Sequence, residues 1–231
     1  MAPTWLTAVA WTALAVAVAS AAVIVVDVYG RGYRQRHMPV MEAVWPITAL
    51  YLGPLAVWGY RRYGRPASPQ WLTDHGADHP PDRPRWAGVT VDTSHCGAGC
   101  SLGDLVSEFV VFGLGATIAG SGLLAEYVGD YVLALGFGLV FQYFAIAPMR
   151  GLSFRKGIVA AAKADILSLT AFEVGLFGWM ALMAFVFFPA PHLTPTSPVY
   201  WFLMQIGMAL GFLTSWPANA WLIRRGFKDA M

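Results

Sequence analysis

Long apolar runs separated by short polar segments dominate the residue pattern of this chain. Each run approaches the roughly 20 residues that cross the hydrocarbon core of a bilayer as a helix. The segments between the runs are rich in Gly, Pro and charged residues, which end helices. The pattern predicts an all-α integral membrane protein, a bundle of about six transmembrane helices. The predicted spans are residues 3–26, 41–60, 102–124, 127–148, 157–188 and 199–223.

The second predicted span has two unusual features. Pro46 and the pair Gly53-Pro54 interrupt it, so we expect a kinked second helix. Residues 48–53 within it resemble residues 170–175 of the fifth span, as in a 3+3 inverted repeat of the transporter kind. The match is short and both segments are apolar, so chance explains it better.

The composition supports the membrane class. Hydrophobic residues make up 57% of the 231 residues and charged residues only 12%, whereas a soluble domain carries about a quarter charged residues. Residues 61–94 lack the periodic apolar pattern of a folded domain, so we expect a polar loop within a single transmembrane domain, residues 1–231. The first span has no charged leader or small-residue cleavage site, so we expect it to be retained.

Lysine and arginine determine the expected orientation. They cluster after the second, fourth and sixth predicted spans, and the positive-inside rule therefore places both termini and the loop 61–94 in the cytoplasm. Arg31, Arg34 and Arg36 then face outward, as an exception to the rule. Thiols on the cytoplasmic side stay reduced. The net charge of +2 follows from the loop bias and gives no reason to expect nucleic acid as a partner.

The only two cysteines of the chain point to metal chemistry. Cys96 and Cys100 follow His95, and Asp104 and Glu108 come next at four-residue steps. If one helix includes all five residues, the side chains of Cys96, Cys100, Asp104 and Glu108 lie along one stripe of that helix. Thiolate and imidazole suit Cu(I) or Zn(II), and carboxylates suit harder cations. We therefore expect these five residues to bind a transition-metal ion at the membrane surface and to pass it inward.

A second interpretation of the same segment remains open. Ser101 and Asp104 fit a capping box, which would start the helix at Ser101 and make Asp104 a capping residue. The cysteines would then lie in a glycine-rich loop, as metal ligands, a redox pair or inert thiols.

Acidic and amide side chains recur within the predicted spans. Counted from the predicted span ends, Glu108, Gln142 and Asp165 lie at one depth on three helices, and Glu173 lies two turns beyond Asp165. Polar groups at this depth usually mark a transport path. The alternatives are a structural polar contact between helices or, for Asp165, an ion pair with Lys163.

Methionines provide secondary metal candidates. Met149 lies at the end of the fourth span, and Met204 and Met208 lie one turn apart on the sixth. Their thioethers suit Cu(I), although packing is the commoner role. We expect no haem, because no histidine lies well inside a span, and no nucleotide, because there is no Walker A loop.

Several motifs resemble an uncharacterised family of bacterial and archaeal membrane proteins, a domain of unknown function. The likeness lies in residues 44–51 with Gly53-Pro54, 95–100 with Gly103-Asp104, 141–144 with 147–151, 163–165 with 167–173, and 200–202 with 204–208. The resemblance extends over nearly the whole chain, and implies a complete single-domain member of a bacterial or archaeal cell membrane. It implies no activity and no site roles.

The sequence favours a transporter or metal-binding membrane protein over an enzyme. The leading hypothesis is transport of Cu(I) or Zn(II) through a Cys/His mouth and an intramembrane carboxylate cluster. The alternatives are a membrane thiol-redox enzyme that uses Cys96 and Cys100, and a proton or small-ion channel. The expected partners are the lipid bilayer and a metal ion, with a homo-oligomer as a further option.

Overall fold

The computed structural model describes residues 2–36, 38–150 and 153–228. The described chain is helical, with one isolated β-bridge between Ile118 and Ser121. The helices are α1 (Thr4–Val25), α2 (Met41–Leu52), α3 (Pro54–Gly59), α4 (Pro69–His75), α5 (Arg85–Leu114), α6 (Gly122–Arg150), α7 (Phe154–Leu182) and α8 (Pro198–Arg224). Shorter helical turns follow α1, α3 and α7: η1 (Val26–Gly30), η2 (Tyr60–Gly64), η3 (Arg65–Ala67) and η4 (Met183–Phe187).

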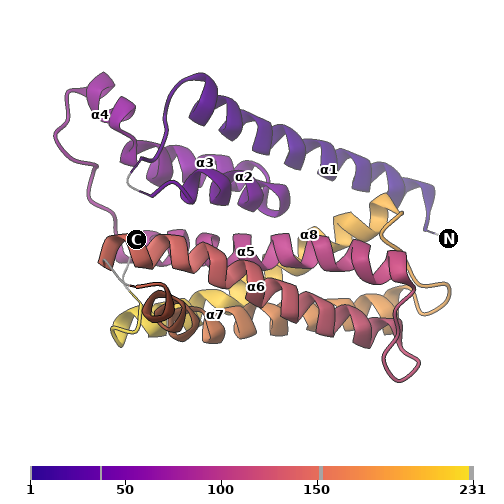
Figure 1. The fold of residues 1–231 in the computed structure, drawn as a ribbon. Helices are drawn as coiled ribbons and strands as arrows, with labels where there is room; N and C mark the ends of the chain where they lie inside the picture. Colours follow the sequence, from indigo (N-terminus) through magenta and orange to yellow (C-terminus); the bar gives the residue numbers. More distant parts are fainter. Residues whose placement is uncertain (1, 37, 151–152, 229–231) are drawn as a thin grey trace.

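The prediction of an all-α membrane protein is confirmed. Within the described residues, five helices are long and apolar enough to cross a membrane: Thr4–Gly30, Arg85–Leu114, Gly122–Phe144, Asp165–Phe187 and Pro198–Arg224. Helices α5 to α8 form a bundle in which each helix is antiparallel to the one before it in the chain, and α1 packs against α2 and α8 (Figure 1). We call the end where α8 begins the Tyr200 end, and the end where α8 finishes the Lys228 end.

The second predicted span, residues 41–60, is not a crossing helix. Gly53 has φ 54° and ψ −130°, a backbone conformation that needs glycine, and Pro54 begins the new helix α3. The chain reverses there, and the ring of Trp45 on α2 contacts that of Tyr60, which follows α3, edge-on at 5.9 Å between centroids. Residues 41–64 therefore form a hairpin that enters the bundle from the Lys228 end and returns to it (Figure 1).

This hairpin changes the topology. Five crossing helices place the start of α1 and the end of α8 at opposite ends of the molecule (Figure 1). The loop with Arg31, Arg34 and Arg36 follows η1 and lies at the Lys228 end, where Gln35 donates a hydrogen bond to the carbonyl oxygen of Gly64 at 3.1 Å. All 15 lysine and arginine residues then lie in the half of the fold nearest that end. The expected exception to the charge bias disappears.

The hairpin also separates the two similar hexapeptides. Residues 48–53 end α2 within the hairpin, whereas residues 170–175 lie inside the continuous helix α7. The two segments therefore occupy unlike elements, as expected from a chance similarity.

Helix α5 begins at residue 85 and not at residue 102, so the polar loop ends at residue 84 and not at residue 94. Ser101 is in the middle of this helix, and the capping-box interpretation is therefore wrong. The sequence pattern hides the first half of α5, because it carries buried polar residues from Asp92 to Cys100 where a hydropathy reading expects apolar ones. These residues face protein, not lipid.

The crossing helices are apolar outside and polar inside. Large apolar side chains face outward, such as Leu114 at 77% exposure and Phe185 at 70%. Asp, Glu, Cys and Ser side chains are buried between α5, α6, α7 and α8. Lipid surrounds such a bundle in a membrane, so this arrangement keeps polar groups away from hydrocarbon.

Small residues allow α5 and α6 to approach closely. A Cβ at Gly99 would lie 2.9 Å from the Cα of Gly138, and one at Gly103 would overlap the backbone of Ala134. Helices in membranes often associate through such small residues. The contact fixes the polar face of α5 against α6 and α7.

Candidate functional site

Four polar side chains line one face of α5. Cys96, Cys100, Asp104 and Glu108 are at most 1% exposed, and the helix is continuous from Arg85. Residues four apart share one face, so the expected stripe exists. The same spacing reaches back to Asp92, a buried residue that the sequence analysis missed.

The stripe begins near a half-buried arginine at the Lys228 end. Asp92 interacts electrostatically with Arg83, which precedes α5. Burial lowers the pKa of the Arg83 guanidinium, and the nearby Asp92 carboxylate opposes that shift. The ordinary pKa of arginine is so high that Arg83 stays charged.

Asp165 on α7 lies at the level of Cys96. The Sγ atom of Cys96 is 3.3 Å from Oγ of Ser168, and Ser168 donates a hydrogen bond to the backbone oxygen of Asp165 at 3.0 Å. The Asp165 side chain also interacts with Cys96. Gly138 of α6 allows the Asp165 carboxylate to approach α6 closely, because a Cβ at position 138 would lie 2.5 Å from Oδ2 of Asp165.

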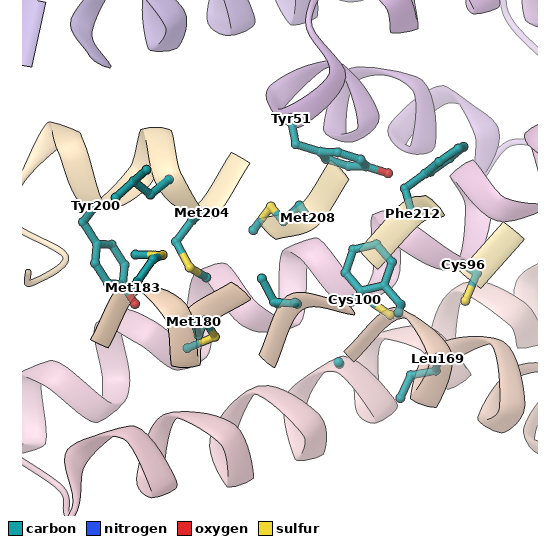
Figure 2. Packing of buried hydrophobic residues seen from close by; sticks show 14 of the residues in the cluster. Tyr51, Cys96, Cys100, Leu169, Met180, Met183, Tyr200, Met204, Met208 and Phe212 are labelled. Carbon is teal, nitrogen blue, oxygen red and sulfur yellow. The ribbon is translucent and has the colours of Figure 1, made fainter. Parts of the chain in front are cut away.

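Glu173 lies one level further along, beside Cys100. Glu173 is 1% exposed and its carboxylate interacts with Cys100. Tyr51, at the tip of the α2–α3 hairpin, reaches the same level and is close to both cysteines (Figure 2). Each thiol therefore faces a carboxylate from α7.

Three carboxylates gather towards the Tyr200 end. Asp104, Glu108 and Asp130 of α6 interact with one another, and all three are fully buried. Their six carboxylate oxygens have no hydrogen-bond partner among the described residues. The hydroxyl of Tyr200 lies beside Glu108. Burying several carboxylates together is costly unless a bound proton or a nearby cation compensates their negative charge.

The structure separates Glu108 from the other two members of the predicted cluster, Gln142 and Asp165. Asp165 lies at the level of Cys96, and Glu108 lies 12 residues further along α5, about 18 Å away at 1.5 Å per residue. Gln142 lies one turn beyond Gly138, towards the Lys228 end. The depth of Glu108 was counted from residue 102, but its helix begins at residue 85, so it lies near the far end of the membrane.

The predicted metal ligands do not meet at one point. His95 is buried on another face of α5, where its ring lies 6.0 Å from that of Phe141. Its ring interacts with the backbone of Phe141 and with Lys228. Across the residues that the structure describes, no three His, Cys, Asp or Glu side chains form a group that could hold a metal ion. The polar residues form a column and not a closed metal site.

Methionine sulfurs continue this column. Met180, Met183, Met204 and Met208 belong to the same buried cluster as the two cysteines. Figure 2 shows them between Tyr200 and Cys100, on the ribbons of α7 with η4 and of α8. The remaining candidate, Met149, has a side chain that lies outside the described residues.

A cavity opens at the Tyr200 end of the bundle. Its volume is about 380 Å³. Its lining includes Glu126, Met180, Met183, His192 and Tyr200. The Nδ1–H of His192 donates a hydrogen bond to the carbonyl oxygen of Phe188 at 3.1 Å. The cavity therefore offers thioether, imidazole and carboxylate groups next to the buried carboxylates.

Comparison with known proteins gives one match. A family model, described as a domain of unknown function (DUF4396), matches residues 85–228. No curated protein and no solved structure is significantly similar to this chain. The matched region starts with α5 and ends at Lys228. It holds the polar column, while α1 to α4 lie outside it, so the match is narrower than the whole-chain resemblance expected from the motifs.

Proposed function

This chain belongs to the DUF4396 family, a domain of unknown function. Since the family supplies no activity, we propose a function from the buried polar column of the chain. We propose that the protein moves a transition-metal ion across the membrane through the interior of α5 to α8. The preferred cargo is Cu(I), with Zn(II) as the second choice.

One observation carries this proposal: buried sulfurs and carboxylates follow one another along the bundle, from the Tyr200-end cavity to Cys96. Thiolate and thioether ligands favour Cu(I), whereas Zn(II) usually takes four ligands in a closed tetrahedral site. An ion that is conducted must also leave each position, which favours several weak sites over one strong site. A column without a closed site is consistent with passage.

The proposal includes an orientation. The basic residues at the Lys228 end favour a cytoplasmic location for that end. The start of α1 would then lie outside the cytoplasm and the end of α8 inside it. We expect a protease added to intact cells to remove an epitope tag fused before α1 and to spare a tag fused after residue 231. Protection of both tags would contradict this orientation.

The two thiols provide the test of the function. We expect the double variant Cys96→Ser, Cys100→Ser to take up Ag(I), a stable mimic of Cu(I), about tenfold more slowly than the natural protein in proteoliposomes, since a combined loss of about 1.4 kcal/mol from the two sulfurs gives that factor. Met38→Leu removes a sulfur that lies outside the column, at a small groove near Trp45, and should leave uptake unchanged. Equal uptake by the double variant would refute the metal proposal.

A proton or small-ion pathway is the second candidate. It is favoured by the six carboxylate oxygens of Asp104, Glu108 and Asp130 that lack partners among the described residues. Proton flux that persists in the Cys96→Ser, Cys100→Ser variant, measured with a pH-sensitive dye in the same vesicles, would favour this candidate over metal transport.

The thiol-redox alternative has less support. Cys96 and Cys100 are on successive turns of one helix and are buried. Side chains four residues apart on a helix have Cβ atoms about 5–6 Å apart, but a disulfide needs about 3.8 Å. A disulfide between them would have to distort α5, and a partner thiol would have to enter the bundle.

A further inference from the structure

A tight turn after α8 directs the chain back into the bundle. Gly226 has φ 72°, and its N–H donates to the oxygen of Ile223 at 3.1 Å. The next N–H, from Phe227, donates to the oxygen of Leu222 at 3.0 Å. This pair of bonds is the Schellman motif, which ends a helix with a glycine in the left-handed conformation. The ring of Phe227 stacks on that of Trp221 at 5.9 Å.

The turn buries the side chain of Lys228, which is only 3% exposed. Its Nζ donates a hydrogen bond to Oδ1 of Asn219 at 2.9 Å. It also interacts electrostatically with Asp165 and His95. The other two lysines, Lys156 and Lys163, are exposed. A buried ammonium requires acceptors and a compensating negative charge, and the Lys228 end of the column supplies both.

Hydrogen bonds connect this lysine to the level of the first thiol. Asn219 donates to the backbone oxygen of Ser215 at 3.1 Å, and Oγ of Ser215 donates to the backbone oxygen of Ser168 at 2.8 Å. The Oγ of Ser168 lies 3.3 Å from Sγ of Cys96. Helices α5, α7 and α8 therefore contribute to one polar group, in contact with the tail that follows α8.

We propose that Asp165, Asn219 and Ser168, beside Cys96, form a cation-binding site at the Lys228 end, and that Nζ of Lys228 occupies it as a tethered ammonium. A monovalent cation that moves along the column has to displace this ammonium. The inference rests on the proposed function for the identity of the cation. The ammonium carries the same unit charge as Cu(I) or Ag(I), so it competes with them for one set of oxygens.

Amine labelling of the full-length protein in detergent tests the tethered position. Without metal, we expect an amine-reactive reagent, followed by mass spectrometry, to modify Lys156 and Lys163 quickly and Lys228 slowly. With Ag(I) present, Lys228 should react faster while the rates at the other two lysines stay constant. Equal rates at Lys228 and Lys156 without metal would overturn the inference, as would a Lys228 rate that bound Ag(I) leaves unchanged.

Equilibrium binding of Ag(I) provides the second readout. If the ammonium leaves the site free in about one molecule in ten, Lys228→Met should lower the apparent Kd for Ag(I) about tenfold. Lys228→Arg keeps the positive charge and should stay near the natural value, and Lys156→Met is the matched control. Suppose that Ag(I) binding requires both cysteines but that its Kd is the same for Lys228→Met and for the natural protein. That result would reject the tethered ammonium and leave the proposed function standing. Absence of Ag(I) binding in every variant would reject both.

Discussion

A methyl group added at Gly103 should force α5 away from α6 and destabilise the whole protein. The new Cβ would overlap the backbone nitrogen and Cα of Ala134, and backbone atoms in a packed helix cannot rotate away as a side chain can. Overpacking of this kind typically costs about 1–3 kcal/mol, and we expect Gly103→Ala to lie at or above the upper end. Thermal unfolding of the protein in detergent, followed by circular dichroism, measures the loss.

Gly113→Ala is the matched control for this substitution. Gly113 is on the same helix, and a Cβ there meets nothing within 4 Å. This variant should be as stable as the natural protein or slightly more stable, because glycine inside a helix costs about 0.5–1 kcal/mol relative to alanine. Gly99→Ala, with its 2.9 Å contact to the Cα of Gly138, should lie between the two. Equal melting temperatures for Gly103→Ala and Gly113→Ala would show that the α5–α6 contact is not as close as described.

Glu108→Gln should nearly abolish transport while leaving the protein folded. In the proposed path, a cation between the Tyr200-end cavity and the cysteines passes Glu108, Asp104 and Asp130. A carboxylate about 4 Å from a cation stabilises it by about 4 kcal/mol at an effective dielectric constant of about 20. Since about 1.4 kcal/mol is a factor of ten, we expect Ag(I) uptake to fall at least about a hundredfold.

The Glu108→Gln variant should be as stable as the natural protein or more stable. Glutamine has the same size as glutamate and removes the like-charge interaction between Glu108 and Asp130, and its amide can still pair with the Tyr200 hydroxyl, which lies beside position 108. Asp78→Asn, in the exposed loop before α5, is the control and should leave uptake unaltered. If Glu108→Gln transports normally, the carboxylates are structural and the path lies elsewhere.

The sequence was sufficient to predict the membrane class and most of the helices. The ends of α6 and α8 lie within a few residues of the predicted spans, because lipid-facing residues such as Leu213 and Val128 keep these segments apolar. The stripe of Cys96, Cys100, Asp104 and Glu108 was predictable as well, because helical spacing depends only on residue number once the helix is continuous.

The start of α5 and the α2–α3 hairpin were not predictable by the same reasoning. Hydropathy estimates the free energy of moving a segment from lipid to water. The first half of α5 is surrounded by protein, so it can be polar. The length of residues 41–60 is that of a span, and only the left-handed conformation at Gly53 turns it back. Contacts such as that of Trp45 with Tyr60 accompany the reversal, and a single sequence does not reveal them.

The candidate site was only partly predictable. Asp130 lies near the start of α6, next to a loop in the sequence, yet it is fully buried against Glu108. Lys228 follows α8 in a basic tail, and no pattern in the sequence indicates that the chain turns back to bring it to Asn219. Both depend on how helices far apart in the chain pack together. The four-residue spacing from Asp92 to Cys96 was the one overlooked signal within the sequence itself.

A helix that stops halfway across a membrane brings its dipole to that depth. Helix α2 ends at Leu52, one residue after Tyr51, which interacts with the two cysteines, so its last carbonyls lie in the same part of the molecule. One of them, the oxygen of Leu50, accepts a hydrogen bond from Gln205 at 2.6 Å. The end of a helix carries a partial negative charge of roughly half an electron. A positive ion between the two thiols would therefore gain stabilisation from backbone that contributes no ligand to it.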